Sequence, residues 1–219
     1  AEIEGPPGDW ENFYAAAGSP ERISLIGFRR EALKSLTGKT LAEAAALRGR
    51  SPVETMIDLV IEDGSRVTVA YTMMSEENLR LQVQRPWMSL CSDEESPAPR
   101  GAFLRRHPHP RAYGSFARFL GHYVRRERLL PLAEAIRPLT RLPARNFRLR
   151  DRGALAPGFF ADLVVFDPGR VEDHATFAEP HRFASGVEHV VVNGELGLRG
   201  GKVTGARPGR VVRGFGWRA

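Results

Sequence analysis

The sequence is poor in cysteine and has no long apolar run. Cys91 is the single cysteine among 219 residues, which excludes an intrachain disulfide framework and is typical of a cytosolic protein. No apolar stretch approaches the roughly 20 residues that a membrane-spanning helix needs. The first seven residues are acidic and proline-rich, unlike a secretory signal peptide. We therefore expect a cytoplasmic protein with no membrane partner.

Acidic residues are outnumbered by basic ones. The chain has 32 Lys and Arg residues against 26 Asp and Glu residues, for a formal net charge of +6. Nucleic-acid binding is one explanation of such an excess. No long basic run interleaved with aromatic residues occurs, however, and many arginines stand beside acids, as in residues 125–128. We therefore expect no nucleic-acid partner, a hypothesis that a salt-dependent binding assay tests. A positive field would instead favour an anionic small-molecule substrate.

The first part of the chain contains clear signals for short elements. Residues 23–28 read as a strand. The segments 40–48 and 51–63 each begin with a capping box and end beside a glycine, which predicts two helices. Alternation of β-branched residues over 66–72 predicts a second strand.

The middle of the chain predicts an α/β fold class. A helix is expected after Ser75, and residues 87–93 read as a buried strand that ends in an acid, Asp93. Helical stripes follow over residues 116–124 and 132–139. An acid at the end of a buried strand, facing a loop rich in His and Arg, is how a (β/α) barrel presents a catalytic group. The alternative is that Asp93 caps a helix or is an ordinary surface acid.

After about residue 150 the sequence pattern changes to short segments rich in β-branched and apolar residues, separated by glycine and proline. Residues 161–167, 187–192 and 195–198 read as strands, and Asn193-Gly194 between the last two is a strong hairpin signal. These features predict a β-domain placed after the α/β part. The strands before it number four or five, too few to close an eight-stranded barrel, which needs roughly 200–250 residues.

Three stretches, taken together and in order, resemble a known family. They are Ser92-Asp93 with the segment from His107 to Tyr123, the segment from Leu155 to Asp167, and His189 to Gly194 with the tail from Gly205 to Arg210. This combination is similar to the N-acyl-D-amino-acid deacylases, or D-aminoacylases, of the amidohydrolase superfamily. The resemblance covers most of the chain.

The resemblance implies a fold class and a domain organisation. It implies an α/β chain that is the C-terminal part of a (β/α)8 metal-dependent hydrolase barrel plus part of a small β-sandwich. Residues 1–150 would be the barrel portion, with a small inserted segment at about 11–74, and residues 151–219 would be the portion of the composite β-sandwich. The chain would then need the N-terminal half of the enzyme as its partner, and it could also form a homo-oligomer.

The resemblance also assigns roles to two side chains. Asp93 matches the carboxylate at the end of the last barrel strand, which is the catalytic general base and acid and a ligand of a second, weaker metal site. Arg111 matches the family's arginine that binds the substrate α-carboxylate, because its planar guanidinium can pair with a carboxylate through two hydrogen bonds. The alternative is that Arg111 is an exposed residue that supports its loop.

Several neighbouring residues are weaker candidates for a role in the site. His107 and His109 could orient Arg111 or approach a metal, but loop histidines more often form local hydrogen bonds. Cys91 would share a strand face with Asp93, where a lone cysteine usually packs rather than binds metal. His122 is expected at the surface or the packing edge of the helix over residues 116–124. We interpret His174, His181 and His189, in the β-rich tail, as structural residues. The acids Glu94 and Glu95 stand where small residues are expected, and they could disfavour acidic substrate side chains.

The main zinc ligands that the family uses are missing from this sequence. A zinc site needs three or four protein ligands, and the chain offers one, Asp93. The resemblance implies zinc-dependent hydrolysis of N-acyl-D-amino acids in the complete enzyme, with the isolated chain inactive. The alternative hypothesis is a non-catalytic amidohydrolase-like module for binding or assembly that lacks the metal site.

Overall fold

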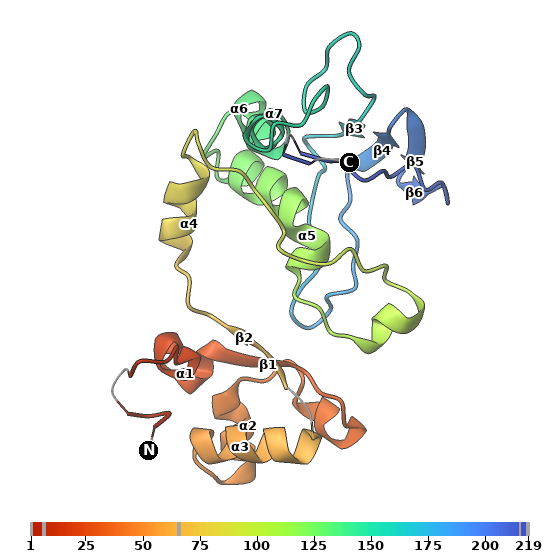
Figure 1. Ribbon diagram of the computed structural model, residues 1–219. Helices are drawn as coiled ribbons and strands as arrows, with labels where there is room; N and C mark the ends of the chain where they lie inside the picture. Colours follow the sequence, from red (N-terminus) through yellow and green to blue (C-terminus); the bar gives the residue numbers. More distant parts are fainter. Residues whose placement is uncertain (1, 6–7, 65–66, 215, 218–219) are drawn as a thin grey trace. The chain divides into compact units, whose positions relative to one another are not determined.

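The computed structural model describes residues 2–5, 8–64, 67–214 and 216–217, and the chain divides into two units (Figure 1). Unit 1 comprises residues 1–75, 97–110 and 176–181. Unit 2 comprises residues 76–96, 111–175 and 182–219. Within the described residues, no helix has both the length and the apolar character needed to cross a membrane.

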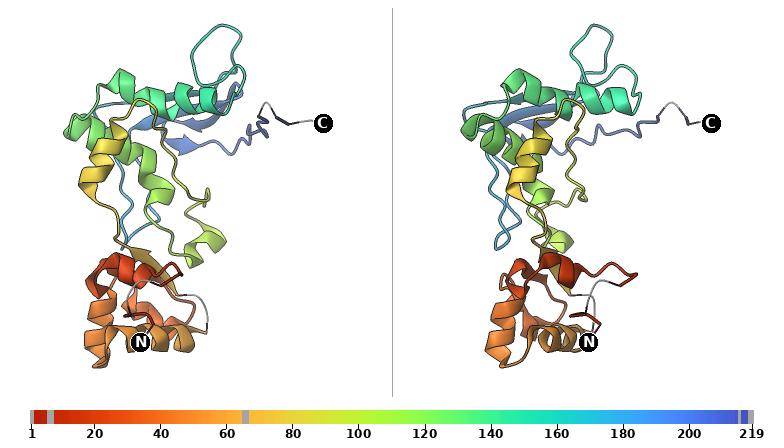
Figure 2. Two further views of the ribbon diagram at one scale, coloured as in Figure 1. Left: turned by 60° about the vertical axis from the view of Figure 1, so that its left-hand side comes forward. Right: turned by 90° about the vertical axis from the view of Figure 1, so that its left-hand side faces the viewer.

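Unit 1 packs two helices against a two-stranded sheet. The predicted strands form as β1 (Ile23–Gly27) and β2 (Thr68–Tyr71), which pair in antiparallel fashion, although Arg66 lies outside the described residues. The predicted helices form as α2 (Leu41–Arg48) and α3 (Pro52–Asp63), drawn in orange in Figure 2. Each begins with its capping box. The remaining elements are α1 (Phe13–Ala17), η1 (Pro20–Arg22), η2 (Glu31–Leu36) and η3 (Gly101–Arg105).

The core of unit 1 lies between these helices and the sheet. Leu25 of β1, Ala44 of α2 and Leu59 of α3 are buried in one cluster. Helix α3 also leaves apolar side chains exposed, among them Val60 and Ile61. The carboxylate of Asp63 is also buried, and it accepts a hydrogen bond of 2.8 Å from the backbone N–H of Arg30. The end of α3 therefore fixes the chain that follows β1.

Unit 2 is built around one long helical segment. This segment runs through α5 (Arg111–Arg118) into a π-helix, η4 (Phe119–Arg126). Most of the apolar stripe predicted over residues 116–124 is buried in the core, but Phe116 at its start is 48% exposed. The other helices of the unit are α4 (Glu76–Val83), α6 (Leu132–Ile136), η5 (Arg137–Leu139) and α7 (Arg141–Asn146). Gly121 allows a close approach, because a Cβ there would lie 2.5 Å from the carbonyl oxygen of Val171.

The C-terminal part of unit 2 forms a four-stranded antiparallel sheet in the order β3-β4-β5-β6. Its strands are β3 (Leu163–Phe166), β4 (Val187–Val192), β5 (Glu195–Arg199) and β6 (Lys202–Val203). The predicted hairpin is confirmed: Asn193 and Gly194 join β4 to β5 with φ angles of 51° and 86°. Such positive φ angles are what a two-residue hairpin turn of this kind requires.

The predicted mixed α/β class is confirmed, with both sheets antiparallel, and the described residues contain no closed barrel. One prediction needs correction. The strand predicted over residues 87–93 is wrong, since these residues form no strand and the Trp87 side chain is 73% exposed. A strand needs a neighbour for its backbone hydrogen bonds, whereas here the N–H of Leu90 donates to the carbonyl of Pro138 at 3.3 Å. The domain division near residue 150 stays a prediction.

Candidate active site

Asp93 lies in the loop between α4 and α5, not at the end of a strand. Its side chain is 90% exposed. Its φ of 48° falls in the left-handed region, which non-glycine residues seldom adopt and where Asp is enriched. The backbone N–H of Asp93 faces the Cys91 sulfur at 3.3 Å, so the chain turns tightly here. The carboxylate is therefore accessible to a ligand from solvent.

Arg111, the first residue of α5, faces two carboxylates. Its Nη2 atom lies 3.5 Å from Oδ2 of Asp93, and its Nε atom lies 3.4 Å from Oε2 of Glu94. Both distances exceed the roughly 2.7–2.9 Å of a strong charge-assisted hydrogen bond. The guanidinium is thus paired electrostatically with the chemical group that it was predicted to bind in a substrate.

Glu94 is the more enclosed of the two acids. Its side chain is 20% exposed, and its Oε1 accepts a hydrogen bond of 3.2 Å from the backbone N–H of Glu95. Burial raises the pKa of Tyr113, and the negative charge of Glu94 raises it further. The field of Glu94 therefore extends along the start of α5. Its pairing with Arg111 was not predicted, and the only signal in the sequence was the run of acids after Asp93.

The two loop histidines belong to unit 1. His107 Nε2 is 2.6 Å from the backbone carbonyl oxygen of Phe177. The ring of His109 meets the Phe177 ring edge-on, with centroids 4.9 Å apart. His107 thus makes a loop hydrogen bond, the more ordinary of its predicted roles, although its partner is 70 residues away in the sequence.

Cys91 does not pack in a core. The interpretation of this residue as part of a buried strand is wrong, because no strand forms and the thiol is exposed. Three other histidines make polar contacts. His122 Nε2 lies 2.8 Å from Glu127 Oε1, and His174 Nε2 lies 2.8 Å from Ser185 Oγ. His189 Nδ1 accepts a hydrogen bond of 3.3 Å from the backbone N–H of Gly200.

The described residues do not form a complete metal centre. No group of three or more His, Cys, Asp or Glu side chains in this part of the chain is arranged to hold a metal ion. Structural zinc sites use four protein ligands and catalytic ones commonly three. Zinc therefore does not fit the residues of this chain taken alone.

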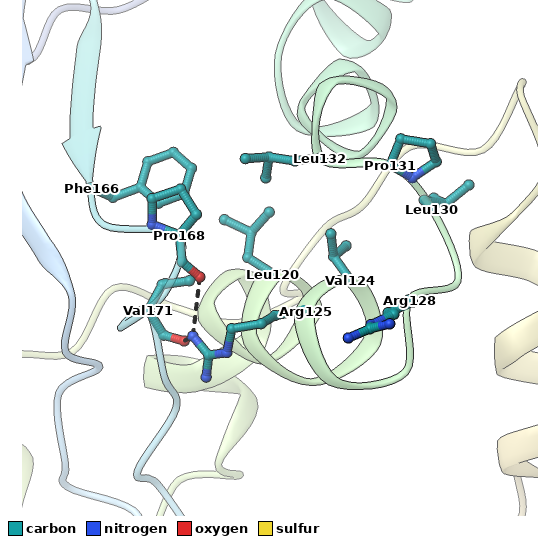
Figure 3. Close-up of a pocket in the computed structure, with 10 residues that line it drawn as sticks. All are labelled: Leu120, Val124, Arg125, Arg128, Leu130, Pro131, Leu132, Phe166, Pro168 and Val171. Carbon is teal, nitrogen blue, oxygen red and sulfur yellow. Dashed lines mark hydrogen bonds between the residues drawn. The ribbon is translucent and has the colours of Figure 1, made fainter.

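A cavity of about 420 Å³ lies in unit 2 between η4, the start of α6 and the end of β3 (Figure 3). Its walls are mainly apolar: Leu120, Val124, Leu130, Pro131, Leu132, Phe166, Pro168 and Val171. Arg125 of η4 links this helix to the segment after β3, since its Nη1 donates hydrogen bonds to the carbonyl oxygens of Val171 at 2.6 Å and Pro168 at 3.2 Å. Asp93, Glu94 and Arg111 do not line this cavity, so it is separate from the predicted site.

The sequence pattern of the amidohydrolase family matches residues 12–196. The chain belongs to the amidohydrolase family. D-aminoacylase from Alcaligenes xylosoxydans xylosoxydans is 40% identical over 178 residues, which cover 81% of this chain and 34% of that protein. N-acyl-D-glutamate deacylase from the same organism is 42% identical over 176 residues, which cover 80% of this chain and 33% of that protein.

Solved structures give the same family. The N-acyl-D-glutamate deacylase from Bordetella bronchiseptica, complexed with zinc and a phosphonate inhibitor, superposes with a TM-score of 0.75 at 34% identity, over 91% of this chain and 39% of that one. A D-aminoacylase structure superposes with a TM-score of 0.73 at 35% identity, over 87% and 37%. The resemblance to D-aminoacylases is thus confirmed, and this amidohydrolase chain spans little more than a third of the length of these relatives.

Proposed function

We propose that this chain is the C-terminal portion of an N-acyl-D-amino-acid deacylase. The complete enzyme hydrolyses the amide bond of an N-acyl-D-amino acid to a carboxylate and a free D-amino acid. The names of the relatives support this activity. The observation that carries the proposal is the contact between the Asp93 carboxylate and the Arg111 guanidinium, which gives a proton acceptor and a carboxylate-binding group side by side.

In this proposal Asp93 acts on the water and on the leaving nitrogen. The carboxylate accepts a proton from the water whose oxygen bonds to the acyl carbon. It then gives that proton to the amide nitrogen as the C–N bond breaks, so that one proton passes from water to the free amine. The exposure of Asp93 allows both partners to reach it.

Arg111 would hold the α-carboxylate of the substrate. Its guanidinium already attracts carboxylates, and its contact with Asp93 is long enough for a substrate carboxylate to displace it. Substrate binding would then release Asp93 from Arg111 at the moment when Asp93 is needed as a base. The two roles are therefore coupled through one pair of residues.

The complete enzyme would hold zinc mainly through residues outside this chain, because the described residues lack a full ligand set. Asp93 would be the chain's single contribution, as a ligand of a second, weaker site. The zinc in the Bordetella bronchiseptica relative supports this part of the proposal.

The test uses a hybrid deacylase, in which this chain replaces the matching third of the Alcaligenes D-aminoacylase. The hybrid is supplied with zinc and assayed for release of D-glutamine from N-acetyl-D-glutamine. We expect release of the D-amino acid and little reaction with the L-enantiomer. A folded, zinc-containing hybrid that releases no D-amino acid would contradict the proposed function.

A further inference from the structure

Glu94 is held more firmly beside Arg111 than Asp93 is. Its side chain is 20% exposed, against 90% for Asp93, and it contacts both the Arg111 Nε atom at 3.4 Å and the Glu95 backbone N–H at 3.2 Å. An acid with two contacts and little exposure is not displaced easily by a ligand. A substrate carboxylate that binds Arg111 will therefore bind next to a fixed negative charge.

The positive charge of Arg111 is shared between Glu94 and Asp93. Asp93, Glu94 and Arg111 together carry two negative charges and one positive charge, and Arg111 must also serve the substrate α-carboxylate. The raised pKa of Tyr113, due first to burial and then to Glu94, indicates that the negative field reaches the neighbouring part of α5. The Tyr113 ring meets the Phe183 ring edge-on at 5.8 Å, so aromatic surface lies next to the acid.

From this arrangement we infer that Glu94 selects substrates whose side chain carries no carboxylate. The preferred class is N-acyl-D-amino acids with neutral or cationic side chains, and Glu94 disfavours N-acyl-D-glutamate and N-acyl-D-aspartate. This inference rests on the proposed function, in which Arg111 binds the α-carboxylate. It bears on a point that the relatives leave open, since their names include both D-aminoacylase and deacylases of D-glutamate and D-aspartate.

The physical basis is repulsion at short range. In this inference the side-chain carboxylate of the substrate lies beside Glu94, and like charges about 6 Å apart in a partly enclosed site change an equilibrium by about tenfold or more. The same charge would attract a cationic side chain. Because the site is open to solvent, high salt should weaken the discrimination.

The test measures kcat/KM of the hybrid deacylase for N-acetyl-D-glutamate and N-acetyl-D-glutamine, which are nearly equal in size and differ in charge. The wild-type chain should prefer N-acetyl-D-glutamine. The substitution Glu94→Gln should raise the ratio of glutamate to glutamine efficiency about tenfold at low salt. Glu94→Asp should keep the wild-type ratio, and Glu134→Gln, on the exposed side of α6, is the matched control.

Two results overturn the inference. If Glu94→Gln lowers the efficiency equally on both substrates, Glu94 only positions Arg111. If the ratio stays within twofold of wild type, the charge at Glu94 does not reach the substrate side chain. Failure of the proposed function gives a different result: no hydrolysis of N-acetyl-D-glutamine by the wild-type hybrid, in which case the inference fails with it.

Discussion

The Nη2 atom of Arg111, the first residue of α5, lies 3.5 Å from Oδ2 of Asp93, which is inside the loop between α4 and α5. The pair is solvent-exposed and lacks the short distance of a strong hydrogen bond, so it contributes little to stability. In the proposed function Asp93 is the base and Arg111 binds the substrate carboxylate, and a pair this weak would be easily exchanged for substrate. Each residue of the pair therefore has a separate, testable role.

Arg111→Lys separates substrate binding from catalysis. Lysine keeps the positive charge but loses the planar fork that pairs with a carboxylate. In the hybrid deacylase we expect kcat/KM to fall about 10- to 100-fold, mainly through weaker binding, because the carboxylate is present in both ground and transition states. An N-acyl amine without the α-carboxylate should be a poor substrate of the wild-type hybrid. For this compound, Arg111→Lys should lower kcat/KM almost no further. Equal losses on both compounds would mean that Arg111 only supports its loop.

The isolated chain should bind no stoichiometric zinc. In the described residues no three potential ligands are grouped, and a tight site needs at least three. Elemental analysis after dialysis should find far less than one zinc per chain. About one zinc per chain that survives mild chelation would show that the chain contains a metal site of its own.

Glu127 should make the stability of unit 2 sensitive to acid. The Arg80 guanidinium donates to both Glu127 oxygens, at 2.7 and 2.8 Å, and holds the pKa of Glu127 below its ordinary value of 4.5. A lowered pKa stabilises the folded state above pH 4.5, and this contribution is lost as the pH falls through the folded-state pKa.

The substitution Glu127→Gln tests this in the isolated chain. Thermal unfolding should show a lower Tm than wild type at about pH 7, and the difference should shrink steadily below about pH 4.5. Glu134→Gln, at an exposed position of α6, is the control and should change little at either pH. A difference between Glu127→Gln and wild type that is independent of pH would contradict the assigned role of the ion pair.

Gly121 should be required for the packing of η4. A Cβ at this position would lie 2.5 Å from the Val171 carbonyl oxygen, so Gly121→Ala would push the backbone of η4 away from the backbone at Val171. Overpacking of this kind costs about 1–3 kcal/mol. Gly209→Ala is the matched control, since a Cβ there meets no atom within 4 Å. Chemical denaturation of the two variants should separate them, and equal stabilities would mean that the 121–171 contact is not tight.

Local chemistry explains which parts of the fold could be predicted. The helices α2 and α3 begin at side chains that cap them, and the β4–β5 turn needs only Asn193 and Gly194. These signals act within a few residues. Helix α7 was not predicted, and Pro143 lies in its first turn, where proline is tolerated.

Parts that depend on distant partners could not be predicted in the same way. Residues 87–93 have the composition of a buried strand, but no described strand pairs with them. The candidate site shows the same limit. The resemblance pointed to Asp93 and Arg111 separately, whereas the contacts of Asp93 and Glu94 with Arg111 depend on how the loop between α4 and α5 returns on itself.

Turnover of the hybrid deacylase with Asp93→Asn tests the central claim most directly. Asparagine keeps the size of the side chain and most of its hydrogen bonding but cannot accept the proton from water. If this chain supplies the general base and acid of a deacylase, kcat for N-acetyl-D-glutamine should fall by about 10²- to 10⁴-fold with unchanged thermal unfolding. Near-normal turnover by the Asp93→Asn hybrid would contradict the account.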